Sequence, residues 1–103
     1  MSWKKYCLFW LIGGVGKLVS ISLVIPAYNE EKNIGLLLKE AVEVFKKNKI
    51  DAEIVVVNDG STDNTKRICE ELSKKYKIIN LVNHEVNKGY SKAVSTGIKH
   101  AKN

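Results

Sequence analysis

The sequence has one proline and seven glycines in 103 residues, which leaves no room for a long flexible linker. It also lacks internal repeats and low-complexity tracts. No zinc-ligand spacing, aromatic RNA-binding signature or arginine-rich stretch occurs, so nucleic acid is not an expected partner. The whole chain is 45% hydrophobic and 27% charged, a composition typical of a single globular domain.

Cysteine is scarce as well. Cys7 and Cys69 are the two cysteines, and they form no CxxC or other metal-ligand spacing. Two isolated cysteines predict unpaired thiols in a reducing, cytoplasmic setting.

The N-terminal segment is apolar but short. Tyr6–Ile12 is strongly apolar, and the uncharged run ends at Gly16, well below the roughly 20 residues that span a bilayer. No A-x-A-like cleavage site follows it. We therefore separate residues 1–16, an apolar extension, from the domain at 17–103. The extension has three interpretations: an interfacial anchor on the cytoplasmic face of a membrane, a strand or helix that patches the domain, or an artefact of an upstream start codon.

The formal charge of the chain is +6. Much of the lysine lies in two clusters, at 46–49 and 74–77, near the expected ends of helices. Cations there interact favourably with the negative end of the helix dipole. The alternative is weak attraction for anionic ligands or an anionic membrane surface.

The hydrophobic pattern alternates between strands and helices. Continuous β-branched runs predict buried parallel strands, and apolar residues at helical spacing predict helices between them. The expected strands are Ser20–Ile25, Glu53–Asn58 and Ile78–Val82, and the expected helices run from Glu30 to about Lys47, from Ser61 or Thr62 onward, and from Gly89 to about Ala101. Asn29, Thr62 or Ser61, and Asn87 are the expected caps, and Ala93, Val94, Gly97, Ile98 and Ala101 the buried residues of the last helix.

This β-α-β-α-β-α order predicts an α/β fold with a parallel sheet in the strand order 3-2-1, because crossovers between parallel strands are right-handed. It corresponds to half of a Rossmann-like three-layer sandwich. The outer edge of the first strand would then be unpaired, next to Leu23 and Ile25. Either residues 6–12 fold back onto that edge, or two chains pair there. We expect self-association, because the glycines at 13–16 are short for a parallel return.

Two strand-to-helix junctions carry chemistry. In Val55–Asp63 an apolar run stops at Asp59, whose carboxylate could accept hydrogen bonds from a nucleobase, and Gly60 permits a tight turn. In Val24–Glu31, Tyr28 could stack on a base or ribose and Glu30 could accept a hydroxyl proton. The alternative in both cases is structural: a turn and a capped helix. A third junction, Asn87–Ala93, has Gly89 before a helix and Lys88 or Lys92 near enough to meet a phosphate.

Together these junctions resemble the N-terminal half of the family 2 glycosyltransferases, which have the GT-A fold. The likeness covers residues 19–103 and is strongest to members that transfer a sugar to dolichyl or other polyprenyl phosphates. It implies a nucleoside-diphosphate sugar donor and hexose transfer, with a lipid-phosphate acceptor. The residues that it places at the base, the ribose or elsewhere near the nucleotide are Pro26, Ala27, Tyr28, Glu30, Asp59, Lys88 and Gly89.

The family's metal-binding Asp-x-Asp, which holds Mg²⁺ or Mn²⁺, is absent from the sequence, and Asn58 stands where many members have an aspartate. We therefore expect the donor-recognition half of the enzyme, as a fragment or a truncated gene product, without catalytic or metal-binding residues of its own. Two other functions stay open: a non-catalytic nucleotide-binding module, and a membrane-peripheral interaction domain that uses residues 1–16.

Overall fold

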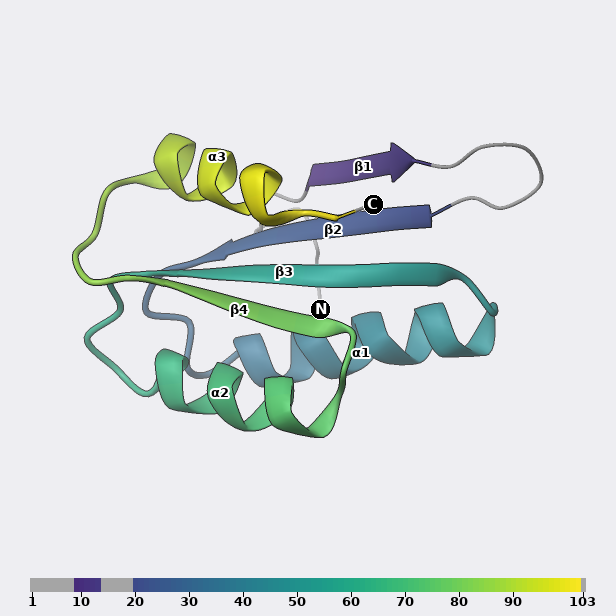
Figure 1. The fold of residues 1–103 in the computed structure, drawn as a ribbon. Helices are drawn as coiled ribbons and strands as arrows, with labels where there is room; N and C mark the ends of the chain where they lie inside the picture. Colours follow the sequence, from purple (N-terminus) through teal and green to yellow (C-terminus); the bar gives the residue numbers. More distant parts are fainter. Residues whose placement is uncertain (1–8, 14–19, 103) are drawn as a thin grey trace.

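The structure is a computed structural model that describes residues 9–13 and 20–102. Strands and helices alternate along these residues (Figure 1). The elements are β1 (Phe9–Gly13), β2 (Ser20–Ala27), α1 (Ile34–Lys47), β3 (Asp51–Asp59), α2 (Thr65–Lys75), β4 (Ile79–His84) and α3 (Tyr90–His100).

The sheet has the order β1-β2-β3-β4. β2, β3 and β4 are parallel, so the predicted order of the three parallel strands is confirmed. Helices α1 and α2 cover one face of the sheet and α3 covers the other, which gives three layers (Figure 1). This is the Rossmann-like α/β arrangement that the sequence predicts.

The expectation of an unpaired edge on β2 is wrong. β1 pairs with β2 in the antiparallel direction, with Phe9 opposite Val24 and Gly13 opposite Ser20. A parallel neighbour needs a crossover of about a dozen residues, but an antiparallel one needs only a short connection. The antiparallel pairing of β1 therefore removes the reason for expecting self-association at this edge. The rest of residues 1–16, including Cys7, lies outside the described residues.

The core has two parts, one on each face of the sheet. The larger part lies under α1 and α2 and includes Leu23, Ile25 and Ile54. The smaller part lies under α3, where Val24 and Val55 contact Ala93. β3 is buried along almost its whole length, as expected for a central strand covered on both faces. The sheet is therefore a rigid base for the loops at its carboxyl end.

Helices α1 and α2 begin a few residues later than the sequence predicts. α1 begins at Ile34 rather than Glu30, and α2 at Thr65 rather than at Ser61 or Thr62. The polar residues that were expected to cap them bond to the neighbouring loop instead, as described below. The N-cap of α3 is Gly89, not Asn87. Ile98, expected in the core, is 41% exposed, because α3 meets the sheet along the narrower line of Ala93 and Gly97.

The strands are longer than predicted at their carboxyl ends. β2 continues through Pro26 to Ala27, and β4 continues through Asn83 to His84. These extensions bring polar side chains onto the sheet next to the loops. Among the described residues, no helix has the length and apolar character needed to cross a membrane.

Candidate functional site

The carboxyl ends of the parallel strands meet at one edge, as the sequence predicts. β2 ends at Ala27, which pairs with Asn58, and Asp59 at the end of β3 pairs with His84 at the end of β4. Tyr28 leaves the sheet directly after Ala27 and is 47% exposed. In open α/β sheets this edge is where ligands bind.

The loops after β2 and β3 are joined by hydrogen bonds. The backbone N–H of Asn29 donates to Ser61 Oγ over 3.0 Å, and the N–H of Thr62 donates to Asn29 Oδ1 over 2.8 Å. Asn29 has a φ of 49°, a left-handed conformation that asparagine tolerates better than most residues. These bonds use the side chains that would otherwise cap the two helices, which explains why both helices begin late.

Asp63 and Thr65 complete this connection. The N–H of Glu30 donates to Thr65 Oγ1 over 2.8 Å, and the N–H of Glu31 donates to Asp63 Oδ2 over 3.2 Å. Burial would raise the pKa of Asp63, but hydrogen bonds from Thr65 and Glu31 outweigh it and hold that pKa below the ordinary value. The two loops therefore form one cross-linked wall.

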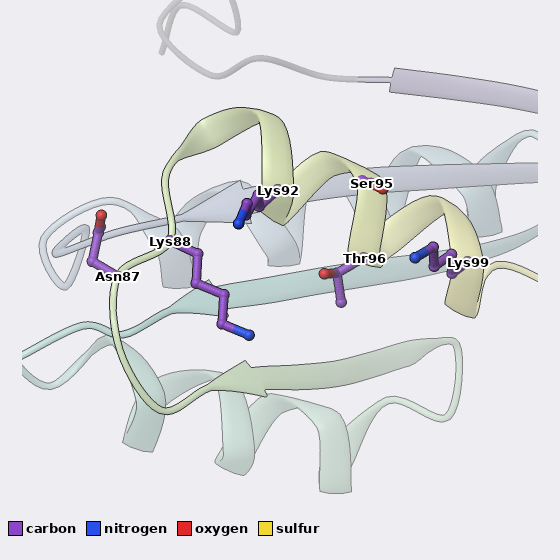
Figure 2. A pocket seen from close by; sticks show the side chains of 6 residues that line it. All are labelled: Asn87, Lys88, Lys92, Ser95, Thr96 and Lys99. Carbon is purple, nitrogen blue, oxygen red and sulfur yellow. The ribbon is translucent and has the colours of Figure 1, made fainter.

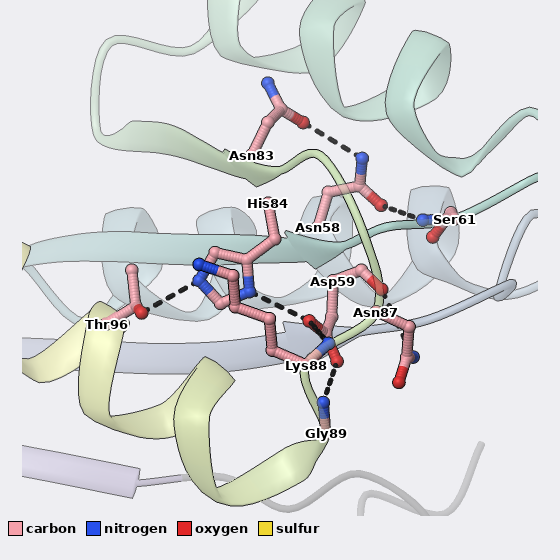
Figure 3. A network of polar contacts seen from close by, with 9 residues as sticks. All are labelled: Asn58, Asp59, Ser61, Asn83, His84, Asn87, Lys88, Gly89 and Thr96. Atoms are coloured by element: carbon pink, nitrogen blue, oxygen red, sulfur yellow. Dashed lines mark hydrogen bonds and ion pairs between the residues drawn. The ribbon is translucent and has the colours of Figure 1, made fainter.

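Asp59 joins β3 to the loop before α3 (Figure 3). Its carboxylate accepts hydrogen bonds from the backbone N–H groups of Lys88, at 2.9 Å, and Gly89, at 3.0 Å. Burial acts to raise the pKa of Asp59, but the hydrogen bonds from His84, Lys88 and Gly89 outweigh it, so the pKa is lowered. An ionised Asp59 thus fixes the turn at which α3 begins.

His84 is the residue of this cluster that sequence reasoning missed. Its Nδ1 lies 2.8 Å from Asp59 Oδ1, and its Nε2 lies 2.8 Å from Thr96 Oγ1 on α3. The residue is buried, with 9% of its surface exposed. The signal was present in the alternation of β4, because Val82 and His84 lie on the same face of the strand, toward α3. The sequence-based prediction ends this strand at Val82, so it leaves His84 outside the sheet.

Asn58 faces the opposite side of the sheet. Its Nδ2 donates to Asn83 Oδ1 over 2.9 Å, and its Oδ1 accepts from the N–H of Ser61 over 3.2 Å. An amide can make both contacts, whereas an ionised aspartate has no donor for Asn83. Asparagine at this position therefore suits its neighbour on β4.

Gly60 brings the loops after β3 and β4 together. Its φ is 69°, and a Cβ at this position would lie 2.3 Å from the backbone nitrogen of Asn87. No larger residue fits without moving the loop after β4. Asn87 Nδ2 also donates to the carbonyl oxygen of Asp59 over 3.3 Å. The three junctions are thus in direct contact at one edge.

The structure places the predicted site residues at this edge in three groups. Pro26 and Ala27 end β2, and Ala27 is only 2% exposed. Tyr28 and the half-buried Glu30 lie in the wall formed with the β3 loop. Asp59 is bonded to Lys88 and Gly89, and it is 3% exposed, so its carboxylate forms the floor of the site rather than its rim.

Within the part of the chain that the structure describes, no group of three or more His, Cys, Asp or Glu side chains is arranged to hold a metal ion. The carboxylate oxygens of Asp59 and Asp63 accept hydrogen bonds from other groups of the protein. The described residues therefore do not supply a divalent-metal ligand set.

Comparison with known proteins identifies the family of this chain. The model of the glycosyl transferase family 2 matches residues 22–103. The chain belongs to glycosyl transferase family 2. A dolichyl-phosphate beta-glucosyltransferase of Trichomonas vaginalis is 40% identical over 89 residues, covering 82% of this chain and 27% of that protein. The dolichyl-phosphate beta-glucosyltransferase of Saccharomyces cerevisiae is 38% identical over 89 residues, covering 80% and 26%.

An uncharacterized protein of Methanocaldococcus jannaschii is 49% identical over 79 residues, covering 76% of this family 2 chain and 32% of that protein. Among solved structures, a mannosyltransferase from Pyrobaculum calidifontis in complex with GDP-mannose and Mn²⁺ superposes with a TM-score of 0.55 at 27% identity, covering 77% of this chain and 23% of that one. The chain spans about a quarter to a third of the length of these relatives.

Proposed function

We propose that this family 2 chain recognises a nucleoside-diphosphate sugar at the carboxyl edge of its sheet, as the donor part of a hexosyltransferase. The observation that carries the proposal is the direct bonding of all three junctions at one edge. A site assembled from three separate loops on a rigid sheet suits a ligand with several parts, such as a base, a ribose and a phosphate.

Each predicted residue has a role in this proposal. Tyr28, half exposed above the sheet, stacks on the base or ribose, and Glu30 accepts from a ribose hydroxyl. Pro26 and the small Ala27 leave room at the end of β2. Asp59 meets the base from the floor of the site while it anchors Lys88 and Gly89 near the nucleotide.

The proposed acceptor is a lipid phosphate. Two of the relatives are named as dolichyl-phosphate beta-glucosyltransferases, and the structural neighbour holds GDP-mannose. The proposed reaction is the transfer of a hexose from a nucleoside diphosphate to a polyprenyl-type phosphate, at or near a membrane surface.

The structural neighbour was solved with Mn²⁺. When bound, a divalent metal neutralises the charge that develops on a leaving diphosphate. The described residues do not fit that metal, because they offer no cluster of ligands for it. We therefore expect this chain to bind nucleotide without transferring sugar.

Nucleotide binding is tested by NMR titration of the chain with UDP and with GDP. We expect the amides of Tyr28, Asp59 and Gly89 to shift together, with a dissociation constant on the order of 1 mM, about −4 kcal/mol. Tyr28→Ala should weaken binding, and Leu36→Ala, which truncates an exposed apolar residue on α1, should not. Titrations that leave all three amides unmoved would contradict the shared site, and robust sugar transfer by the purified chain would contradict the absence of catalysis.

A further inference from the structure

A second feature lies beside α3, away from the wall that holds Tyr28. It is an open depression of about 560 Å³. Figure 2 shows that its side chains rise from successive turns of α3 and from the loop before it. Its lining residues are Asn87, Lys88, Lys92, Ser95, Thr96 and Lys99.

All of the charged side chains that line this depression are positive. The segment from Val86 to Lys102 has four lysines and no aspartate or glutamate, in a chain that has 11 acidic residues elsewhere. On α1, by contrast, Lys39 and Lys46 have Glu40 and Glu43 between them. No acidic side chain lines the depression, so nothing in its lining offsets the three ammonium groups.

The helix dipole does not account for this arrangement. Lys99 lies in the last turn of α3, where a cation is favourable. Lys92, however, lies in the first turn, and Lys88 just precedes the N-cap Gly89. Both cations are thus at the positive end of the helix, where the dipole opposes them, and no acidic residue of α3 occupies that turn. The Asp59 carboxylate satisfies the backbone N–H groups of Lys88 and Gly89 at this end, but it does not line the depression that the lysine side chains border.

We propose that the depression beside α3 binds a phosphoryl group, as a phosphate ester separate from the nucleotide at Tyr28. Lys88, Lys92 and Lys99 provide ammonium donors on flexible stems around the depression. Ser95 adds a hydroxyl donor, as suits a ligand with several acceptor oxygens. Thr96 forms the inner wall, because its hydroxyl is engaged by His84.

The ester comes either from a soluble phosphorylated metabolite or from a phospholipid headgroup. The chemistry in the depression is the same for both. Lys88 also belongs to the proposed nucleotide site, whereas Lys92, Ser95 and Lys99 do not, so the proposal is tested at Lys92 and Lys99 and does not rest on nucleotide binding.

The test is a titration of the whole chain with inorganic phosphate at constant ionic strength, followed by NMR. We expect the amides from Lys92 to Lys99 to shift saturably. The double variant Lys92→Gln/Lys99→Gln should weaken phosphate binding about tenfold or more. Glutamine keeps the helix propensity of lysine, and both side chains are exposed, so the fold is retained.

The matched control is Lys39→Gln/Lys46→Gln on α1. It removes the same two charges at the same seven-residue spacing from exposed positions of another helix. We expect it to leave phosphate binding unchanged. Equal weakening in the two double variants would show general charge attraction and overturn the proposal, as would a titration without saturable shifts between Lys92 and Lys99.

Binding of the chain to lipid vesicles distinguishes the two sources of the phosphate. One set is phosphatidylcholine alone, and the other adds phosphatidic acid, whose headgroup is a phosphomonoester. Retention on the second set that is lost in Lys92→Gln/Lys99→Gln but kept in the α1 control assigns a lipid headgroup. Saturable binding of inorganic phosphate without vesicle retention assigns a soluble ester. UDP shifts at Tyr28 are read separately, so a failure of nucleotide binding does not obscure this result.

Discussion

His84 donates a hydrogen bond from Nδ1 to Asp59 Oδ1 over 2.8 Å, with their side chains only 7% and 4% exposed. A carboxylate can only accept, so Nδ1 carries the hydrogen. Nε2 faces the hydroxyl of Thr96, which can either donate or accept. Both the neutral and the charged ring therefore keep two hydrogen bonds, and the pair ties β3 to β4 and to α3 in either state.

We expect Asp59→Asn to destabilise the domain by about 2 kcal/mol at pH 7, because charge-assisted bonds to two backbone N–H groups and to His84 are weakened. The pKa of Asp59 is lowered on folding, so its stabilisation is present above the ordinary pKa of 3.8 and is lost as the pH falls through the lower folded value. Urea denaturation of both proteins at pH 7 and near pH 3 measures this difference.

The stability difference between wild type and Asp59→Asn should therefore shrink in acid. Asp63, whose pKa is also lowered, titrates in both proteins and cancels from the comparison. Asp51→Asn is the control, because Asp51 is exposed and accepts a bond from the Ser20 hydroxyl. A difference that stays constant from pH 7 to pH 3 would mean that Asp59 is not held as a carboxylate.

His84→Leu should cost about 2 kcal/mol, because Asp59 loses a buried donor and Thr96 a partner. His84→Asn should cost less, since an amide nitrogen can take the place of Nδ1. The backbone amide shifts of Lys88 and Gly89 should move in the leucine variant and largely recover in the asparagine variant. His100→Leu, at an exposed histidine at the C-terminal end of α3, should move neither amide. Equal effects of the leucine and asparagine substitutions would argue that size alone matters at position 84.

Gly97→Ala should destabilise the domain even though alanine favours helix by about 1 kcal/mol. The added Cβ would lie 2.3 Å from Val24 Cγ1 and 3.2 Å from Val57 Cγ2, and overpacking of this kind costs roughly 1–3 kcal/mol. Val24→Ala makes room for the new methyl group, so the double variant should be more stable than the sum of the single effects. Thermal unfolding of the four proteins of this cycle gives the coupling, and strict additivity would place the clash elsewhere.

The Cys69 thiol should resist alkylation in the native protein. Burial, with smaller contributions from the charges of Asp63 and Glu70, raises the pKa of the Cys69 thiol to about 12. Little thiolate then exists at pH 8, and the side chain is fully buried. In a Cys7→Ser background, iodoacetamide should react with Cys69 only as fast as the domain unfolds. Rapid alkylation without denaturant would mean that this part of the core opens easily.

The sequence predicts those features that depend on the pattern of apolar residues within one strand or helix. The apolar run Val55–Val57 predicts a buried strand, and the apolar positions Leu37 and Leu38 predict the buried face of α1. These patterns lie within a single element, so they can be recognised without knowing which residues pack against them. The small residues Ala93 and Gly97 likewise predict part of the buried face of α3.

Hydrogen bonds between residues far apart in the sequence could not be predicted in the same way. Ser61 caps no helix because Asn29, 32 residues away in sequence, takes its hydroxyl as a partner. His84 depends on a pairing with Asp59 that exists only once β4 continues beyond Val82. Local capping rules cannot anticipate such competitors, because the competing bonds come from tertiary contacts.

The position of β1 has a consequence for how this domain meets other strands. The backbone groups on the outer side of β2 pair with Phe9–Gly13 from Ser20 to Val24. Two strands cannot share these hydrogen bonds, so any strand that joins the sheet beside β2 must first displace β1. Pairing of another segment along Ser20–Val24 is therefore an exchange of one strand for another rather than a simple addition.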